Sequence, residues 1–229
     1  MPVSGPDGKT RVTLRESEVE RDLGVFIDNK LTFKDHVAKT IAKANRILGL
    51  VRRSFDHLSK KTFTQLFKCL VRPILEYGHC VWQPNHKMLA SNVEDVQRRA
   101  IKLLGHLKEK SYPERLRVLK FPTLEHRRRR GDMIEVYKYL HGHYKVEKPI
   151  FILATTTDLR GHMFKLQQNR FRLNIRGNFF SRRTINDWNS LPEEVVSALT
   201  INSFKNQLDN FWNKLPTIYE PQCQNLRYE

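Results

Sequence analysis

Apolar side chains recur at helical spacing in the first part of the chain. Between residues 33 and 51 they stand three or four positions apart, at Phe33, Val37, Ile41, Ala44, Leu48 and Val51. This spacing places them on one side of a helix. We expect Thr32 to cap that helix, with Asp35 favourably placed in its first turn. Because the lysines and arginines of this segment fall mostly at other positions, the helix should have an apolar side and a basic side.

The same spacing predicts further helices along the chain. Ser59 is the expected N-cap of a second helix, which Pro73 should kink because it lacks an amide proton and crowds the preceding turn. Its aromatic residues and those that follow, Phe63, Phe67, Tyr77 and Trp82, fall on apolar faces and are interpreted as core. The remaining helices are expected near residues 87–104, 113–119, 123–140, 181–190, 192–198 and 201–213.

Alternating and β-branched stretches predict a small amount of strand. Residues 10–14 and 22–28 should form a hairpin or two neighbouring strands, and residues 163–175 alternate in part. We therefore expect an α+β, mainly α fold: a short N-terminal β-strand pair, a helical bundle and a small C-terminal α+β segment. The predicted units are a leader with strands (1–31), a helical domain (32–140), a linker (141–160) and a C-terminal segment (161–229).

The charge makes a polyanion the expected partner. Lysine and arginine number 41 against 24 aspartates and glutamates, giving a net charge of +17. Residues 1–110 carry 21 − 12 = +9 and residues 111–229 carry 20 − 12 = +8, so the charge belongs to folded structure rather than to a tail. RNA or DNA is the expected ligand. The alternative for each basic run is a solvated surface. The candidate contacts are Lys39, Lys43, Arg46, Arg72, Arg98, Arg99, Arg127, Arg128, Arg129 and Arg130.

Other classes of protein are disfavoured by the composition. No apolar stretch has the length of a membrane span, and the first eight residues lack the apolar core of a signal peptide. Three cysteines, an odd number, do not suggest a disulfide framework. We therefore expect no membrane partner and an intracellular protein, nuclear or cytoplasmic, that is not secreted.

No catalytic constellation is evident. Nucleotide-binding, zinc-protease and serine-hydrolase motifs are absent from the sequence. His79, Cys80 and His86 match no standard zinc spacing, and a core thiol beside surface histidines is favoured. Asp28 ends a predicted strand but is interpreted as a turn residue. Glu94, Asp95, Glu193 and Glu194 are interpreted as solvated. We predict no catalytic residues, no metal site and no cofactor.

Several short motifs occur in an order that resembles a known family. They are Leu23-Gly24-Val25 with Ile27-Asp28 and Leu31, Leu70–Tyr77, Val81–Pro84, Val96–Ala100, Leu124–Arg128, Arg160-Gly161-His162, Arg183–Pro192 and Ser203–Lys205. Together they resemble the C-terminal region of reverse transcriptases from non-LTR (LINE-type, jockey/CR1-like) retrotransposons, over about residues 10 to 213.

The resemblance implies part of an RNA-directed DNA polymerase. Palm-end strands that help hold the primer end would be followed by a helical thumb that grips the template–primer duplex. The family's Tyr/Phe-Ala-Asp-Asp turn, which carries its palm aspartates, is absent from the sequence. The resemblance thus implies a transposable-element fragment without polymerase activity, which binds RNA or DNA through its basic helices without sequence preference.

Two alternatives stay open from the sequence. The chain could be a protein-interaction module or a non-functional remnant with incidental basic charge, with a protein partner at the surface left by the missing palm. It could also act as an enzyme in trans if another chain supplied the carboxylates. Basic side chains gathered on one face would favour nucleic acid over a protein partner, and primer extension with Mg²⁺ would test the enzyme.

Overall fold

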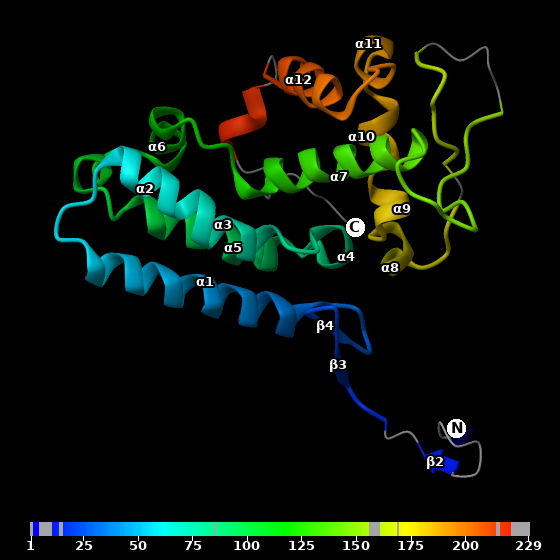
Figure 1. The fold of residues 1–229 in the computed structure, drawn as a ribbon, viewed down its shortest axis with the longest axis horizontal. Coiled ribbons are helices and arrows are strands. Elements are labelled where there is room, and N and C mark those ends of the chain that lie inside the picture. Colours follow the sequence, from blue (N-terminus) through cyan, green and yellow to red (C-terminus); the bar gives the residue numbers. More distant parts are fainter. Residues whose placement is uncertain are drawn as a thin grey trace.

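The computed structural model is mainly helical, as the sequence predicts, with short strands at its N-terminal end (Figure 1). It describes residues 2–4, 11–13, 16–84, 86–155, 161–168, 170–213 and 216–220. Parts of the predicted leader, of the predicted linker and of the C-terminal segment lie outside these residues. No helix in the described ranges is both long enough and apolar enough to cross a membrane.

The strands pair differently from the expectation. β1 (Pro2–Ser4) pairs antiparallel with β2 (Arg11–Thr13), and β3 (Val19–Asp22) pairs antiparallel with β4 (Val25–Asp28). The predicted strands near 10–14 and 22–28 therefore lie in separate hairpins. In the second hairpin Leu23 and Gly24 have φ of 44° and 87°, which matches the two-residue turn that suits the twist of paired strands.

Helix α1 (Lys34–Ser54) forms as predicted, but its start is held differently. Phe33 occupies the N-cap position in a left-handed conformation, and the Thr32 hydroxyl makes only a long hydrogen bond, at 3.5 Å, with the Lys34 amide. Asp28 instead accepts hydrogen bonds from the amides of Lys30, Thr32 and Phe33 at 3.1, 3.0 and 2.6 Å. Partial burial acts to raise the pKa of Asp28, but these hydrogen bonds outweigh it and lower the pKa. Asp28 is therefore a turn residue, as favoured from the sequence.

At the predicted kink, the helix forms a π-helical turn just before Pro73. Ser59 caps α2 (Lys60–Leu66) by accepting from the Thr62 amide at 3.1 Å. The chain then continues through the π-helical turn η1 (Phe67–Val71) into α3 (Arg72–Glu76). Because Pro73 cannot donate a backbone hydrogen bond, the π turn lets the helix pass it without a break. Phe63, Phe67 and Trp82 are buried as predicted, whereas Tyr77 is 58% exposed and was wrongly assigned to the core.

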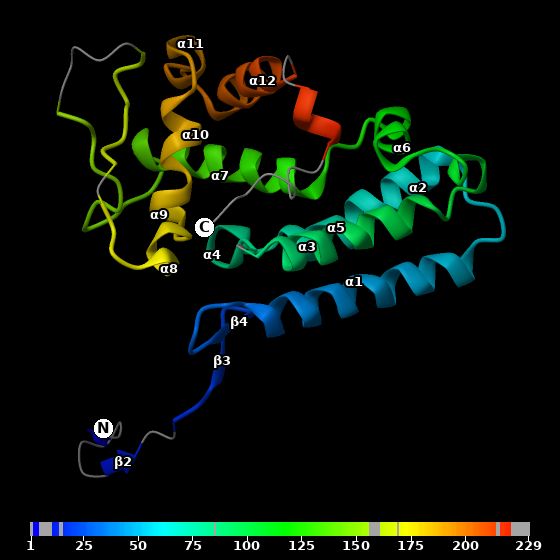
Figure 2. The ribbon, with the colours of Figure 1, turned by 180° about the vertical axis from the view of Figure 1, so that it is seen from behind.

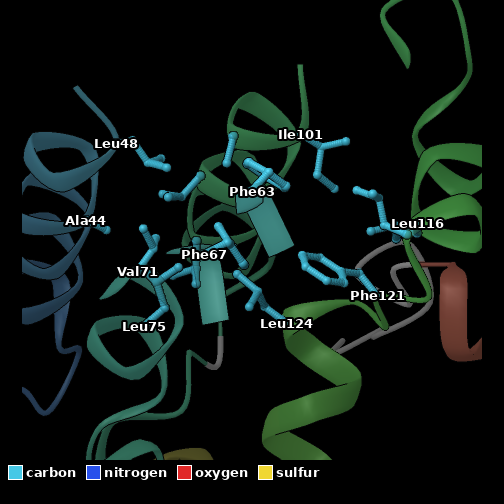
Figure 3. Packing of buried hydrophobic residues seen from close by; sticks show 14 of the residues in the cluster. Ala44, Leu48, Phe63, Phe67, Val71, Leu75, Ile101, Leu116, Phe121 and Leu124 are labelled. Atoms are coloured by element: carbon cyan, nitrogen blue, oxygen red, sulfur yellow. The ribbon is translucent and has the colours of Figure 1, made fainter. Parts of the chain in front are cut away.

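A first core joins α1 to the helices that follow it (Figure 3). These are α2, η1, α3, α4 (His79–Trp82), α5 (Lys87–Ile101), η2 (Gly105–Leu107) and α6 (Tyr112–Leu119). Figure 3 shows Ala44 and Leu48 of α1 on one side and Phe63, Phe67 and Phe121 at the centre, with Leu124 beside them. The core therefore takes one side of α1 and leaves the other side outside.

A second core lies on the far side of α7 (Leu124–Leu140). Met133, Ile134, Val136 and Tyr137 of α7 pack there against the C-terminal helices. These helices are α9 (Phe180–Arg183), α10 (Ile185–Asn189), α11 (Glu193–Val196) and α12 (Ile201–Trp212). The short α8 (Asn174–Gly177) precedes them, and η3 (Pro216–Tyr219), whose Tyr219 packs against the first core, follows them. Both views show α7 between the two sets of helices (Figures 1 and 2). Because Leu124 belongs to the first core, α7 contributes to both.

Most described residues between 141 and 155 are exposed, and Phe151 is the buried one among them, packed in the second core. Leu153 forms an isolated antiparallel bridge with Leu166. Apart from this bridge, the strand expected over 163–175 does not form in the described residues, and α8 begins at Asn174. The strand expectation was therefore wrong.

Candidate nucleic-acid interface

The outer side of α1 presents exposed basic side chains. Lys39, Lys43 and Arg46 are all exposed, and spacings of four and three residues put them on the same side of the helix. We call these three residues the α1 basic face. Among the described residues none forms an ion pair with them. Ala38 and Ala42 are exposed on the same helix and add little bulk beside the charges.

Lys39 is held in place by an aromatic ring rather than by an acid. Its ammonium nitrogen lies 3.5 Å from the centroid of the Phe26 ring on β4. Such a contact orients the cation without neutralising it. Lys34, Arg52 and Arg53 are further exposed basic residues of α1, and Asp35 is its acidic one. The helix thus offers a net positive surface about 30 Å long, at 1.5 Å per residue.

The other candidates on α5 are only partly available. Arg99 is exposed. Arg98 pairs with Asp95 one turn earlier, and its guanidinium lies 4.8 Å from the centroid of the Tyr112 ring. About a third of each side chain in that pair remains exposed. Arg98 therefore has partners within the fold, whereas Arg99 can reach a ligand.

Arg72 lies inside the protein. It is 7% exposed, and its guanidinium lies 5.7 and 4.8 Å from the ring centroids of Phe67 and Phe121. Burial, followed by the nearby Arg127, lowers its pKa to about 10, and Glu76 acts in the opposite direction. A side chain in this position cannot contact a phosphate at the surface. The assignment of Arg72 to the interface is corrected accordingly.

The four consecutive arginines of α7 are used inside the molecule. Arg127 forms a two-pronged pair with Glu76 of α3, Arg129 with Asp187 of α10, and Arg130 with Asp209 of α12. Arg128 is 1% exposed, and its Nε donates to Gln83 at 3.0 Å. The run therefore connects α7 to helices of both cores. Arg128 is buried, so its assignment as a phosphate contact was wrong. The other three arginines already have carboxylate partners.

Glu94 was wrongly interpreted as solvated. It is 1% exposed, and it accepts from the Tyr112 hydroxyl at 2.5 Å and from the Leu124 amide at 2.9 Å. Burial raises its pKa, although these hydrogen bonds and the nearby Arg128 act to lower it. Glu94 thus satisfies the free amide at the start of α7. Glu193 and Glu194 are exposed, as expected.

His79 and Cys80 have a partner that sequence reasoning missed. Asp132 of α7 places a carboxylate oxygen 3.4 Å from His79 Nε2, and Cys80 Sγ lies 3.6 Å from the same nitrogen. His86 is exposed and does not join them. Asp132 could not be found from sequence because it is far along the chain on another helix. Gly131 permits the approach, since a Cβ there would lie 2.6 Å from His79 Nε2.

The contacts within this cluster are those of a structural network. The thiol and the carboxylate both approach one ring nitrogen, whereas a nucleophile–base–acid relay uses both nitrogens of the ring. Burial, and then Asp132, raises the pKa of Cys80, which disfavours its thiolate. Arg183 donates to both carboxylate oxygens of Asp132 at 3.0 and 3.2 Å. The cluster therefore joins α4, α7 and α9 structurally.

Comparison with known proteins finds a distant relative. No family model matches the sequence, and no solved structure matches it. The chain is similar to "Uncharacterized protein B0403.1" of Caenorhabditis elegans, with 26% identity over 126 residues. The alignment spans 54% of this chain and 64% of that protein, less than two thirds of the relative's length. The name of that relative states no activity, substrate or partner.

Proposed function

We propose that this chain is the C-terminal part of a LINE-type reverse-transcriptase-like polypeptide and binds RNA or DNA duplexes without sequence preference. The α1 basic face is the contact surface in this proposal. The observation that carries it is a difference in ion pairing between two basic helices. Lys39, Lys43 and Arg46 are exposed without a described ion pair. Arg127, Arg129 and Arg130 of α7 have acidic partners.

Duplex binding requires this kind of surface. Most of the affinity for a nucleic-acid backbone comes from lysine and arginine side chains that displace counterions from phosphates. Contacts to phosphates position the ligand and carry no sequence information. A straight helix with cations at successive turns can follow one strand of a duplex. The α7 arginines would first have to break their ion pairs with carboxylates, which costs free energy. The α1 basic face binds without this cost.

The chain alone is proposed not to polymerise DNA. Two-metal nucleotidyl transfer needs carboxylates that converge on a pair of ions. Asp28 is engaged by backbone amides, Glu94 by Tyr112 and Leu124, and Asp132 by Arg183. These three carboxylates have partners that keep them from acting together. Primer extension by the purified chain with Mg²⁺ tests the proposal, and robust nucleotide incorporation would overturn it.

Duplex binding is tested with a charge-matched pair of triple variants. Lys39→Gln/Lys43→Gln/Arg46→Gln removes three charges from α1, and Lys108→Gln/Lys110→Gln/Lys148→Gln removes three exposed charges elsewhere. Binding of a fluorescent RNA–DNA duplex is measured by anisotropy over a salt series. The α1 variant should lower the slope of log affinity against log salt by about 2 to 3, since each phosphate contact contributes about 0.9. Equal losses in the two variants would contradict the proposal.

A protein-interaction module is the second candidate, and one observation favours it. Val81, Ile150 and Ile152 are each more than half exposed, yet all three line the same cleft. Exposed apolar groups that gather in one place mark interaction sites. This candidate predicts that the chain binds a protein through the cleft and that loss of the α1 charges leaves that binding unchanged.

A further inference from the structure

A cleft of about 680 Å³ lies where the N-terminal hairpin, α4 and the C-terminal helices meet. Its walls come from Ile27 and Phe33 on one side, from Val81 of α4 and Gln83 just after it, and from the segment that contains Phe179. The volume is within the range of about 300–1,000 Å³ typical of small-ligand sites. Nothing in the duplex-binding proposal uses this cleft.

The lining combines flat apolar groups, amides and cations. Aromatic rings come from Phe33, Phe151, Phe179 and Phe180, and side-chain amides from Gln83, Gln167 and Asn178. Arg176 and Arg182 supply positive charge, and among the described residues no aspartate or glutamate lines the cleft. The complementary ligand is therefore a flat body with hydrogen-bonding edges and a negative charge. A nucleotide has these three properties in its base and its phosphate.

Phe179 and Arg176 present the two recognition elements side by side. The guanidinium carbon of Arg176 lies 4.8 Å from the centroid of the Phe179 ring, and both side chains are exposed. Phe179 is 37% exposed, so part of its surface is open to a stacking partner. A base can stack on the ring while the guanidinium reaches the attached phosphate.

The cleft lies next to the start of α1. Phe33, which lines the cleft, immediately precedes α1. Ile27, which also lines it, follows Phe26, whose ring contacts the Lys39 ammonium group. A nucleic acid that lies along the α1 basic face can therefore reach the cleft past the N-terminal end of the helix.

We propose that the cleft binds an unpaired nucleotide at the end of a duplex held on the α1 basic face, with the base on Phe179 and the phosphate at Arg176. This inference rests on the proposed duplex binding. The opposing occupant, an acidic and apolar segment of a protein partner, would not make affinity depend on the end of a duplex.

Tailed and blunt duplexes test the inference on the full-length chain. One RNA–DNA duplex is used blunt and with a short single-stranded tail at either end of a strand, and anisotropy gives the affinities. The tail should raise affinity about five-fold or more, since base stacking on an aromatic ring contributes about 1–3 kcal/mol. Phe179→Ala and Arg176→Gln should each remove this gain and leave blunt-duplex affinity nearly unchanged.

Matched variants separate the cleft from general effects. Phe55→Ala replaces a phenylalanine of similar exposure at the opposite end of α1, and Arg172→Gln removes an exposed charge outside the cleft lining. Both should keep the gain from the tail. A gain that is lost equally in the control variants would overturn the assignment to the cleft.

The outcomes distinguish this inference from the duplex-binding proposal. Equal affinity for tailed and blunt duplexes, with blunt binding still dependent on the α1 charges, would overturn the cleft and leave duplex binding intact. Blunt binding that does not depend on the α1 charges would overturn duplex binding. In that case calorimetry with 5′-AMP tests the cleft separately. Binding that Phe179→Ala abolishes would support a nucleotide site, and no binding of 5′-AMP would overturn the proposal.

Discussion

Helices α1 and α7 are both rich in basic residues, but they use the charge in opposite ways. The α1 basic face has no described acidic partner, whereas Arg127, Arg129 and Arg130 of α7 pair with acids 51, 58 and 79 residues away. α1 packs on one core with one side, while α7 contacts both cores and has neighbours around most of its circumference. Charge density along a sequence therefore does not reveal whether the charge is free to bind.

Removing an acidic partner of the α7 region should have the largest effect on stability. The side chains of Asp132 and Arg183 are 5% and 16% exposed, so Asp132→Ala leaves a largely buried guanidinium without its carboxylate. We expect the free energy of unfolding to fall by about 3–5 kcal/mol in urea denaturation. Asp132→Ala/Arg183→Met removes both charges and should lose less. A change below about 1 kcal/mol in Asp132→Ala would remove the distinction between the two helices.

Acid should destabilise the protein through His126 of α7. Burial, and then the nearby Arg129, lowers the pKa of His126 to about 4 from its usual 6.5. The unfolded chain takes up this proton below about pH 6.5 and the folded chain only near pH 4. Stability is therefore lost as pH falls through that window, by roughly 3 kcal/mol.

The variant His126→Phe isolates this effect. It keeps an aromatic ring against Trp212, whose centroid lies 5.2 Å from that of His126. Thermal unfolding across the same pH range should show a shallower fall in stability for the variant. Wild-type and variant profiles that fall in parallel would contradict the role of His126.

The partly exposed pairs of α7 should each contribute modestly. The side chains of Arg129 and Asp187 are 33% and 29% exposed and share two hydrogen bonds. A double-mutant cycle with Arg129→Ala and Asp187→Ala should give a coupling energy of about 0.5–1 kcal/mol that decreases with salt. A coupling of zero would mean that this pair is energetically no different from the unpaired cations of α1.

Neutralising the α1 basic face should have the smallest effect on stability. Lys39, Lys43 and Arg46 are like charges at spacings of four and three, which destabilise a helix by about 0.2–0.5 kcal/mol per pair. Loss of the Lys39 contact with the Phe26 ring, worth about 0.5–1 kcal/mol, acts in the opposite direction. The triple glutamine variant should therefore change the free energy of unfolding by less than about 1 kcal/mol in thermal unfolding. A clearly larger loss of stability would indicate ion pairs on α1.

Features set by neighbouring residues were predictable from the sequence. The period of apolar residues located α1, α5 and α7, and Ser59 was identified as a cap because its hydrogen bond reaches only three residues along the chain. Thr32 is not the N-cap because the N-cap position falls one residue later, at Phe33, and the Thr32 hydroxyl donates to Asp28 at 3.2 Å. Local pattern therefore predicts elements well where no tertiary contact competes.

The errors at the candidate site come from partners distant in sequence. Glu94 was assigned to solvent, but its burial depends on Tyr112 and Leu124, which are 18 and 30 residues away. Arg72 is covered by Phe121 from another segment. The three residues of the α1 basic face kept their predicted exposure because the pattern of α1 alone determines which side packs. Their binding of nucleic acid stays a prediction.

The position of α7 in both cores has a consequence for synthesis on the ribosome. Its first turn completes the first core as soon as residue 124 emerges, while Met133, Val136 and Tyr137 must wait for helices that end at Trp212. At translation rates of about 5–20 residues per second this wait lasts roughly 4–18 s. During that time the nascent chain exposes an apolar stripe, so α7 is where a chaperone would first be needed.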